Sequence, residues 1–286
     1  MVEVSRTNQV KDFYNQVGWQ RISDELYQNA IYEDLRPVSR EYIERCHMRV
    51  KVHLAPEGKY LLDAGSGPVQ WPAYLAYSEG YQYRVCMDIS YLALTEARNR
   101  LCEKGLYVVG DISRLPFQTN VFGGTVSMHT LHHLPSEDQK KAYDEMYRTM
   151  EAGRTMVVVN GAASSRLMER LNWMIRLAER LGVKTSVEVK TVKPAAVKPK
   201  KDDETGQQAR GTYIQKNSIP WIKSELKNYK PQILPWRSVS VRFMRSVIHP
   251  WLAGKYWLRF IFRREEMDPR WYAENGQYPM IVINKD

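Results

Sequence analysis

Short apolar segments alternate with helical patterns between residues 58 and 161, and this alternation limits the possible folds more than any other feature. The apolar segments are rich in β-formers and cover residues 59–65, 83–90, 105–111, 121–128 and 154–161. Near-continuous apolar runs of this kind are typical of strands that are covered on both faces. Strand and helix alternating five times predicts a parallel, doubly wound α/β sheet.

Two of the intervening helices carry recognisable boundary residues. In the segment SYLALTEARNRLCEKG, Ser90 is a suitable N-cap and Gly105 a suitable C-terminal stop. In the segment SEDQKKAYDEMYRTM, Ser136 and Gln139 have the spacing of a capping box. We therefore expect a helix in each segment.

The flanks of this core have a different organisation. Residues 10–55 are predicted to form helices. In the segment over residues 40–54, one face of the helix is expected to consist of Tyr42, Ile43, Cys46, Val50 and Leu54.

After residue 161 we expect an amphipathic helix over 164–182, a flexible linker over 184–210, a strand over 236–243 and a final strand at the C-terminus. The expected units are an N-terminal helical lid (1–57), a cofactor-binding core (58–161), an inserted cap (162–235) and the last two strands with a basic aromatic helical segment between them (236–286).

Charge and composition exclude several classes of protein. No stretch of eighteen uninterrupted apolar residues is present, and the N-terminus lacks the apolar region of a secretory signal. Three cysteines without CxxC spacing favour a reducing, cytoplasmic location over a zinc site or disulfide framework. Residues 1–160 carry 18 Lys+Arg against 20 Asp+Glu, whereas residues 161–286 carry 24 against 12. The basic character of the chain belongs to its second part.

A glycine-containing turn follows the first predicted strand in the segment LLDAGSGPVQ. Backbone N–H groups in such a turn can approach a nucleotide. Gln70 stands where the dinucleotide fingerprint requires its last glycine, which weakens the case for NAD. Asp88 and Asp111 end the next two strands, where carboxylates can accept from ribose hydroxyls and from an adenine amine. The pattern predicts an adenosine-binding site.

The segments LLDAGSG, VCMDIS, GDISRLPF and SMHTLHHLP, taken in order, resemble the class I S-adenosylmethionine-dependent methyltransferases of the small-molecule, type 11-like group. The resemblance covers about residues 58–161. It implies a Rossmann-like, mostly parallel seven-stranded sheet that ends in an antiparallel hairpin, with S-adenosyl-L-methionine as cofactor. Val69 departs from the family pattern, in which a third glycine would stand.

The resemblance also implies roles for individual residues. Asp63, Gly65 and Gly67 would surround the methionine part of the cofactor. Asp88 would hold the ribose and Ile89 would lie against the adenine. The remaining positions implied to bind the cofactor are Asp111, Ile112, Met128 and His129.

Candidate catalytic residues follow the fourth predicted strand. His129, His132 and His133 lie at the edge of the sheet where ligands bind, and histidine accepts protons near neutral pH. We expect His133 to be the base, with His129 as the next choice. Packing within the LHHLP loop is the alternative for each. No carboxylate pair accompanies the histidines, so no metal site is expected.

The predicted function is methyl transfer to a small, sugar- or lipid-linked acceptor, with oxygen as the expected acceptor atom. The alternatives are an RNA methyltransferase, with nucleic acid the least favoured partner, and a non-catalytic scaffold or regulatory protein that binds the cofactor. In the lid, Tyr14, Trp19, Arg36 and Arg40 could meet the acceptor.

A basic and aromatic segment over residues 242–264 has three open interpretations. Together with Tyr213 and Trp221, the rings of Trp251, Tyr256 and Trp257 could form an apolar cap over the pocket. They could also lie on an anionic membrane surface or bind RNA. Pro250 is expected to divide the segment into two short helices.

Overall fold

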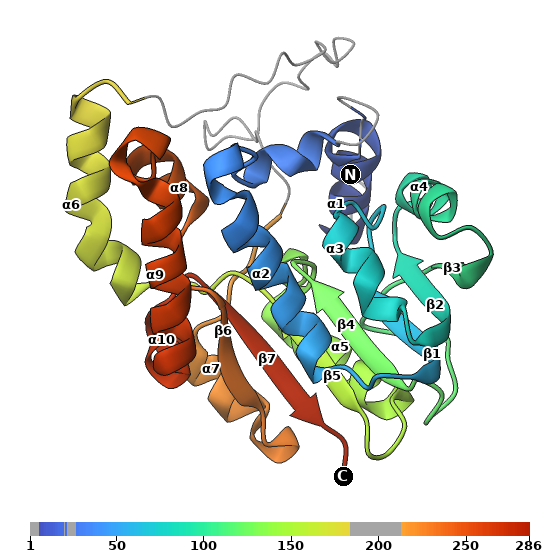
Figure 1. Ribbon diagram of the computed structural model, residues 1–286. Coiled ribbons are helices and arrows are strands. Elements are labelled where there is room, and N and C mark those ends of the chain that lie inside the picture. Colours follow the sequence, from blue (N-terminus) through green and yellow to red (C-terminus); the bar gives the residue numbers. More distant parts are fainter. Residues whose placement is uncertain (1–5, 20, 22–26, 184–212) are drawn as a thin grey trace, which may run out of the picture.

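The computed structural model describes residues 6–19, 21, 27–183 and 213–286, and these form a seven-stranded sheet between layers of helices (Figure 1). The strand order is β3-β2-β1-β4-β5-β7-β6. All neighbouring strands are parallel except β7, which pairs antiparallel with β5 and β6. The strands are β1 (Gly58–Ala64), β2 (Tyr81–Asp88), β3 (Gly105–Val109), β4 (Gly124–Met128), β5 (Thr155–Val159), β6 (Gln232–Arg237) and β7 (Tyr278–Asn284). The expected doubly wound sheet with an antiparallel final pair is confirmed.

Ten α-helices and several short helical turns connect these strands in the part of the chain that the structure describes. The α-helices are α1 (Arg6–Phe13), α2 (Pro37–His53), α3 (Pro72–Leu75), α4 (Tyr91–Leu101), α5 (Ser136–Thr149), α6 (Arg166–Arg180), α7 (Ile219–Glu225), α8 (Val241–Val247), α9 (Gly254–Met267) and α10 (Pro269–Asn275). The turns used below are η1 (Tyr14–Gly18), η2 (Gln28–Tyr32), η5 (Leu131–His133), η6 (Lys227–Tyr229) and η7 (Pro250–Leu252).

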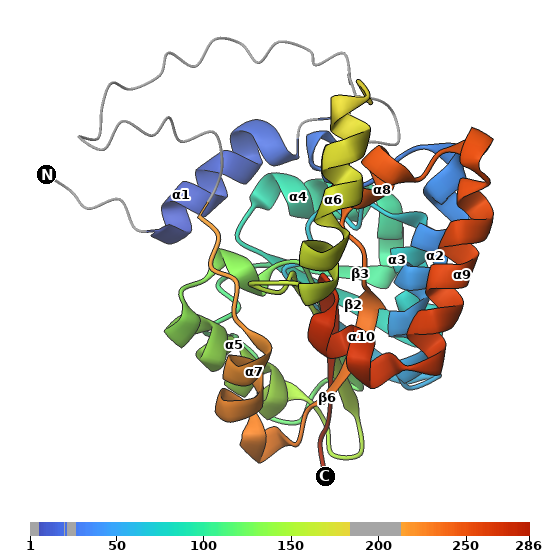
Figure 2. The ribbon, with the colours of Figure 1, turned by 90° about the vertical axis from the view of Figure 1, so that its left-hand side faces the viewer.

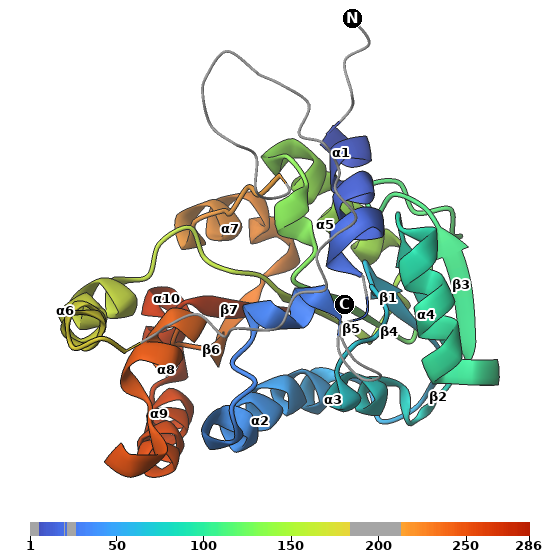
Figure 3. The same cartoon turned by 90° about the horizontal axis from the view of Figure 1, so that it is seen from above.

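Successive residues of each strand enter different cores, because side chains alternate between the two faces of a sheet. Leu61 and Val157 pack on the side of α2, α4, α8 and α9, whereas Leu62 and Val158 pack on the side of α5 and α7. The view from above shows α5 and α7 on one side of the sheet and α2, α3 and α9 on the other (Figure 3). Coverage on both faces explains why the strands read as continuous apolar runs.

The C-terminal helices pack beside the β6–β7 end of the sheet, where α6, α8, α9 and α10 lie together (Figures 1 and 2). The helix α9 also packs along α2, and the expected apolar face of α2 is buried. Buried Glu265 of α9 accepts hydrogen bonds from Tyr42 and Arg49 of α2 and from Ser238. This carboxylate joins three segments that are distant in sequence. Residues 184–210, expected to be a linker, lie outside the described residues.

The strand expected over residues 236–243 is wrong in its position. The strand β6 ends at Arg237, and residues 241–247 form α8 instead. The alternating pattern of this segment resembles a strand, but the Ser240 side chain accepts from the Phe243 amide and caps a helix. The expected break at Pro250 is confirmed, since η7 separates α8 from α9.

Of two predicted helix boundaries, one is confirmed in part and one is wrong. Helix α4 ends at Leu101, a 3₁₀ turn over Cys102–Lys104 follows it, and Gly105 caps that turn as the first residue of β3. At the start of α5 the N-cap is Pro135, so Ser136 and Gln139 form no capping box. Their side chains bind the segment after residue 212 instead, because Ser136 pairs with Asn217 and Gln139 donates to the Gln215 carbonyl. Tertiary partners thus took the place of local ones. The predicted N-cap at Ser90 is confirmed.

Candidate active site

One cavity of about 370 Å³ opens at the edge of the sheet where the parallel strands end. It lies below the N-terminal segment that contains α1 and η1, and the segment after residue 213 closes another side. All ten residues predicted as cofactor-binding or catalytic line this cavity: Asp63, Gly65, Gly67, Asp88, Ile89, Asp111, Ile112, Met128, His129 and His133. The fold therefore brings the predicted set together, while the role of each residue remains a prediction.

The turn after β1 requires glycine at two positions. Gly65 and Gly67 have φ of 76° and 54°, in the left-handed region that favours glycine. A Cβ on Gly65 would lie 2.1 Å from the Thr130 side chain, and one on Gly67 would lie 2.9 Å from the Trp19 ring. The turn is thus closely packed under the lid. Val69, which replaces the third glycine of the family pattern, has φ of 51° and is fully buried.

Asp88 at the end of β2 closes against this turn. Its carboxylate accepts from the backbone amides of Gly67 at 2.9 Å and Ser90 at 2.8 Å. Burial raises the pKa of Asp88 to about 6, and the nearby Asp63 carboxylate adds to the shift, whereas the two amides oppose it. The Asp88 carboxylate is therefore fixed beside the glycine turn, and its role toward a ribose stays a prediction.

The two other predicted acids are in different surroundings. Asp63 is buried and accepts from Arg84 Nε at 3.0 Å and Nη2 at 2.6 Å, so its charge is paired within the sheet. Asp111 accepts from the amide and the hydroxyl of Ser113, both at 2.8 Å. Asp63 therefore stabilises the strand ends beneath the turn, and Asp111 has oxygen lone pairs left for a ligand.

His133 is held between the lid and the segment after residue 212. Its Nδ1 lies 2.9 Å from the Tyr213 carbonyl and its Nε2 lies 2.7 Å from the Tyr14 hydroxyl. Since a carbonyl only accepts, Nδ1 carries the proton and Nε2 accepts from Tyr14. Burial lowers the pKa of His133, partly offset by the Tyr213 carbonyl, so the ring is neutral and its basic nitrogen is the one that bonds to the Tyr14 hydroxyl.

The other two histidines have different partners. His129 has φ of 56°, and its ring packs edge-on against Trp236 and Tyr278. Burial lowers the pKa of His129 to about 3, with further contributions from Arg237 and other cationic groups nearby. His132 bonds through Nδ1 to Asn160. The Tyr14 hydroxyl bonds to His133, and the assignment of His133 as the base stays a prediction.

Further residues that line the cavity were not singled out by the sequence analysis. They come from the N-terminal segment, α2, the segment after residue 212 and the β6–β7 pair: Glu33, His47, Lys216, Trp236, Arg237 and Tyr278. Buried Arg237 pairs with Glu33 at 2.5 Å and lies over the Tyr278 ring. No motif marks these positions, because they come from distant segments, and the paired Glu33 and Arg237 are 204 residues apart.

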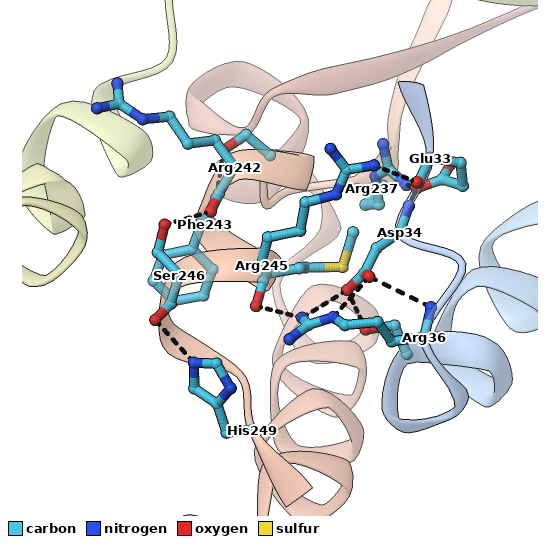
Figure 4. Close-up of polar contacts among 12 residues, drawn as sticks. Glu33, Asp34, Arg36, Arg237, Arg242, Phe243, Arg245, Ser246 and His249 are labelled. Carbon is cyan, nitrogen blue, oxygen red and sulfur yellow. Dashed lines mark hydrogen bonds and ion pairs between the residues drawn. The ribbon is translucent and has the colours of Figure 1, made fainter. Parts of the chain in front are cut away.

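The acidic pair Glu33–Asp34 is surrounded by arginines from α8, β6 and the start of α2 (Figure 4). Arg36 binds the Asp34 carboxylate and the Met244 carbonyl, and Arg245 donates to the Glu33 carbonyl. Arg36 and Arg40 do not line the cavity, contrary to the expectation that they could meet the acceptor. Tyr14 and Trp19 do line it.

The basic aromatic segment does not cover the cavity. Trp251, Tyr256 and Trp257 are 75%, 70% and 57% exposed and contribute no lining, and Trp221 packs on the α5 side of the sheet. The interpretation of Trp221, Trp251, Tyr256 and Trp257 as a cap over the pocket is therefore wrong, whereas the segment of Tyr213 does lie at the cavity, where the Tyr213 carbonyl bonds to His133. Among the described residues, no helix is both long and apolar enough to cross a bilayer, and no group of three metal-ligating side chains occurs.

Comparison with known proteins agrees with this geometry. Residues 62–158 match a family model described as a methyltransferase domain (Methyltransf_11). A curated relative, the tRNA (carboxymethyluridine(34)-5-O)-methyltransferase of Arabidopsis thaliana, is 27% identical over 145 residues. The match spans 49% of this chain and 34% of the relative, about a third of its length.

Solved structures share the fold over nearly the whole chain. The magnesium protoporphyrin IX methyltransferase of Synechocystis PCC 6803 has a TM-score of 0.54 at 14% identity, with 97% of this chain and 98% of that chain covered. The geranyl diphosphate C-methyltransferase of Streptomyces coelicolor has a TM-score of 0.52 at 12% identity, with 98% of each chain covered. At these identities the likeness establishes the fold alone.

Proposed function

Because the core of this chain is a class I S-adenosylmethionine-dependent methyltransferase domain, we propose that the protein transfers a methyl group from S-adenosylmethionine to the oxygen of a small, sugar- or lipid-linked acceptor. One observation carries the proposal. The glycine turn and the strand-end acids share a single cavity with a neutral histidine whose basic nitrogen faces a tyrosine hydroxyl.

The residues of the cavity fit this cofactor. Asp88 would accept from the ribose hydroxyls, and Asp111 from the adenine amine, between Ile89 and Ile112. The methionine part, with an ammonium and a carboxylate, would lie at the turn of Gly65 and Gly67.

Two buried polar atoms near that turn have no partner among the described residues. They are Nε1 of Trp19, a donor, and Oε1 of Gln70, an acceptor. A ligand with both a carboxylate and an ammonium group can satisfy this combination, whereas leaving the atoms unpaired in a buried site is costly. The donor set therefore supports a zwitterionic amino-acid moiety at this end of the cavity.

S-adenosylmethionine, when bound, supplies a methyl group attached to a positively charged sulfur, and this sulfur is a good leaving group. The protein must then orient the acceptor and remove its proton. Tyr14 is placed to accept a hydrogen bond from the acceptor hydroxyl while its own hydrogen goes to Nε2 of His133. The Tyr213 carbonyl stabilises the resulting imidazolium through Nδ1–H. We propose this short relay as the route of the proton.

Calorimetry tests the cofactor assignment. We expect S-adenosylmethionine and S-adenosylhomocysteine to bind, and NAD to show no comparable binding. Tight NAD binding with no heat from either sulfur ligand would refute the assignment. Incubation of a cell extract with the protein and a deuterated methyl donor, followed by mass spectrometry, then identifies the acceptor by its mass increase.

An RNA acceptor is the second candidate. The observation in its favour is the tRNA methyltransferase named above, whose sequence matches about half of this chain. Release of S-adenosylhomocysteine that depends on added tRNA, and stops after ribonuclease treatment, would establish this alternative. Turnover in ribonuclease-treated extract would support the small acceptor.

We also propose that α9 and η7 bring the enzyme to an anionic membrane surface. One stripe of α9 carries exposed aromatic and basic side chains at helical spacing, namely Tyr256, Trp257, Phe260, Arg263 and Arg264. Trp251 of η7 is also exposed. Aromatic rings favour the headgroup region, and arginines are attracted to anionic lipids. A lipid-linked acceptor would then be close to the enzyme.

A further inference from the structure

A bulge in β6 turns two neighbouring side chains into the cavity. Along a regular strand, Trp236 and Arg237 would point to opposite faces. In β6 the register shifts between Pro235 and Arg237, so that Pro235 pairs with Pro279 and Arg237 with Tyr278. Such a bulge redirects a side chain. As a result Trp236 and Arg237 both line the cavity and are 1% and 2% exposed.

Arg237 presents an unused donor edge. Its Nη1 binds Glu33, which fixes the guanidinium, whereas Nε is buried with no partner among the described residues. The Nε–Nη2 edge is the one that binds two oxygens of a carboxylate in parallel. Arg36, Arg242 and Arg259 use this edge on carboxylates elsewhere in this protein.

Two more buried nitrogens in the same wall have no partner among the described residues. They are Nε1 of Trp236, which only donates, and Nε2 of His47. The His47 ring stacks on Trp236 with centroids 5.5 Å apart, and burial, with a contribution from Arg237, lowers the pKa of His47 to about 3. His47 is therefore neutral at pH 7. Leaving the Arg237 Nε and Trp236 Nε1 donors unpaired is costly, so the wall is suited to a ligand that accepts hydrogen bonds.

Besides the Arg237–Glu33 pair, this wall carries one positive charge, that of Lys216, whereas Asp88 and Asp111 lie at the strand ends of the same cavity. Arg237 is balanced by Glu33, and Asp63 by Arg84. Lys216 lines the cavity beside Gly161 and forms no ion pair with the described residues. The pKa of His129 is lowered first by burial and then by Arg237, His47 and Lys216, which places these groups in one electrostatic neighbourhood. One uncompensated cation matches a singly charged anion.

We propose that the methyl acceptor carries a carboxylate, which the Nε–Nη2 edge of Arg237 and the Trp236 indole N–H bind at this wall of the cavity. Lys216 supplies the balancing charge. The proposal rests on the proposed function, because it assigns this wall to the acceptor. The wall would anchor an acidic, partly aromatic or apolar acceptor between the rings of His47, Trp236 and Tyr278. The hydroxyl of this acceptor would be directed to the Tyr14–His133 pair.

The test uses matched pairs of probes on the full-length protein, with and without saturating S-adenosylhomocysteine. Each pair consists of a carboxylate and its primary amide: benzoate and benzamide, 4-hydroxybenzoate and 4-hydroxybenzamide, cinnamate and cinnamamide. Phenyl phosphate is the dianionic arm. Tryptophan fluorescence and calorimetry measure binding. We expect carboxylates to bind roughly ten- to a hundredfold more tightly than their amides, as two charge-assisted hydrogen bonds imply.

The variant Glu33→Gln with Arg237→Met removes both members of the buried pair, so that no charge is left unpaired. It is expected to abolish the preference for carboxylates and to retain the affinity for S-adenosylhomocysteine, which also shows that it is folded. The control Arg242→Met, outside the cavity, is expected to retain the preference. If the double variant does not fold, Arg237→Lys replaces it, with loss of the bidentate preference expected.

Each other outcome overturns the proposal. Equal binding of acids and amides, or binding by none of the acids, removes the carboxylate site. Tighter binding of phenyl phosphate indicates a phosphate-bearing acceptor. Carboxylates that bind only without S-adenosylhomocysteine would assign the Arg237 edge to the cofactor itself. Failure of S-adenosylhomocysteine to bind at all would instead overturn the proposed function, while the acid–amide comparison still reports on Arg237.

Discussion

The hydroxyl of Tyr14 lies 2.7 Å from Nε2 of His133, although 119 residues separate the two in sequence. Burial raises the pKa of Tyr14, and the nearby Asp88 carboxylate adds to the shift, so the phenol keeps its proton at neutral pH. Tyr14 of the N-terminal segment therefore bonds to the candidate base and lies near the acid that is predicted to hold the ribose.

The first prediction concerns this pair. With the acceptor identified by mass spectrometry, His133→Ala should lower kcat about 10²–10⁴-fold, the range of general-base catalysis, and leave cofactor affinity nearly unchanged. Tyr14→Phe should also lower kcat, and the double variant should be no slower than His133→Ala, because both groups act on one proton. His132→Ala, in the same loop but bound to Asn160, is the control. An equal loss of cofactor affinity and rate in His133→Ala would make His133 part of the cofactor loop.

The second prediction concerns the pH dependence of cofactor binding. The pKa of Asp88 is raised to about 6, and ribose hydroxyls favour the ionised carboxylate, so binding must displace its proton at lower pH. The affinity for S-adenosylhomocysteine should fall as the pH drops below about 6, by up to roughly tenfold per unit. The free energy of unfolding depends on pH in the opposite direction. A carboxyl group with a raised pKa in the folded state stabilises that state at low pH, and this contribution is lost as the pH rises through about 6.

Calorimetry between pH 5 and 8 measures the effect. Asp88→Asn retains the size of the side chain and cannot titrate, so its affinity should be weaker, roughly ten- to a hundredfold at pH 8, and independent of pH. The pKa of His129, at about 3, lies outside this range. Parallel pH profiles for the variant and the unchanged protein would exclude Asp88 as the source.

The third prediction concerns the contact of α9 with α2. Glu265 is fully buried and accepts from Tyr42 at 2.7 Å and Arg49 at 2.9 Å. Glu265→Ala leaves the Arg49 charge buried without this partner and should lower the free energy of unfolding by about 3–5 kcal/mol. Glu266→Ala is the matched control, because Glu266 binds the same arginine but is exposed, so its loss should be about 0–1 kcal/mol. Denaturant unfolding compares them, and similar losses for both would contradict the central role of Glu265.

The fourth prediction concerns the membrane-facing stripe of α9. The protein should sediment with vesicles that contain phosphatidylserine, but not with phosphatidylcholine alone, and salt should weaken the binding. Arg263→Glu with Arg264→Glu should reduce it strongly, since each basic residue near an anionic surface contributes about 1 kcal/mol. Lys227→Glu with Lys230→Glu, which makes the same charge change at η6 on the other side of the sheet, should have little effect. No sedimentation with either vesicle type at low salt would refute the membrane proposal.

Local sequence patterns were sufficient for the sheet and for the cofactor half of the cavity. Apolar runs that end in Asp63, Asp88 and Asp111 predict parallel strands, and the carboxyl ends of parallel strands meet at one edge. The glycine turn has its own conformational requirement, visible in the positive φ of Gly65 and Gly67. These features depend on residues within a few positions of each other, so the sequence alone predicts them.

Only the tertiary structure decided the other half. Trp236 and Arg237 share the cavity because β6 bulges at the edge of the sheet, and the segment itself has an alternating pattern that predicts a longer regular strand. Glu33 reaches Arg237 across 204 residues, and Tyr14 reaches His133 across 119. The side chain that satisfies a buried charge or a histidine nitrogen depends on which elements pack together. Hydrophobic periodicity records that a residue is buried but not which partner it meets, and so these contacts became visible only in the folded chain.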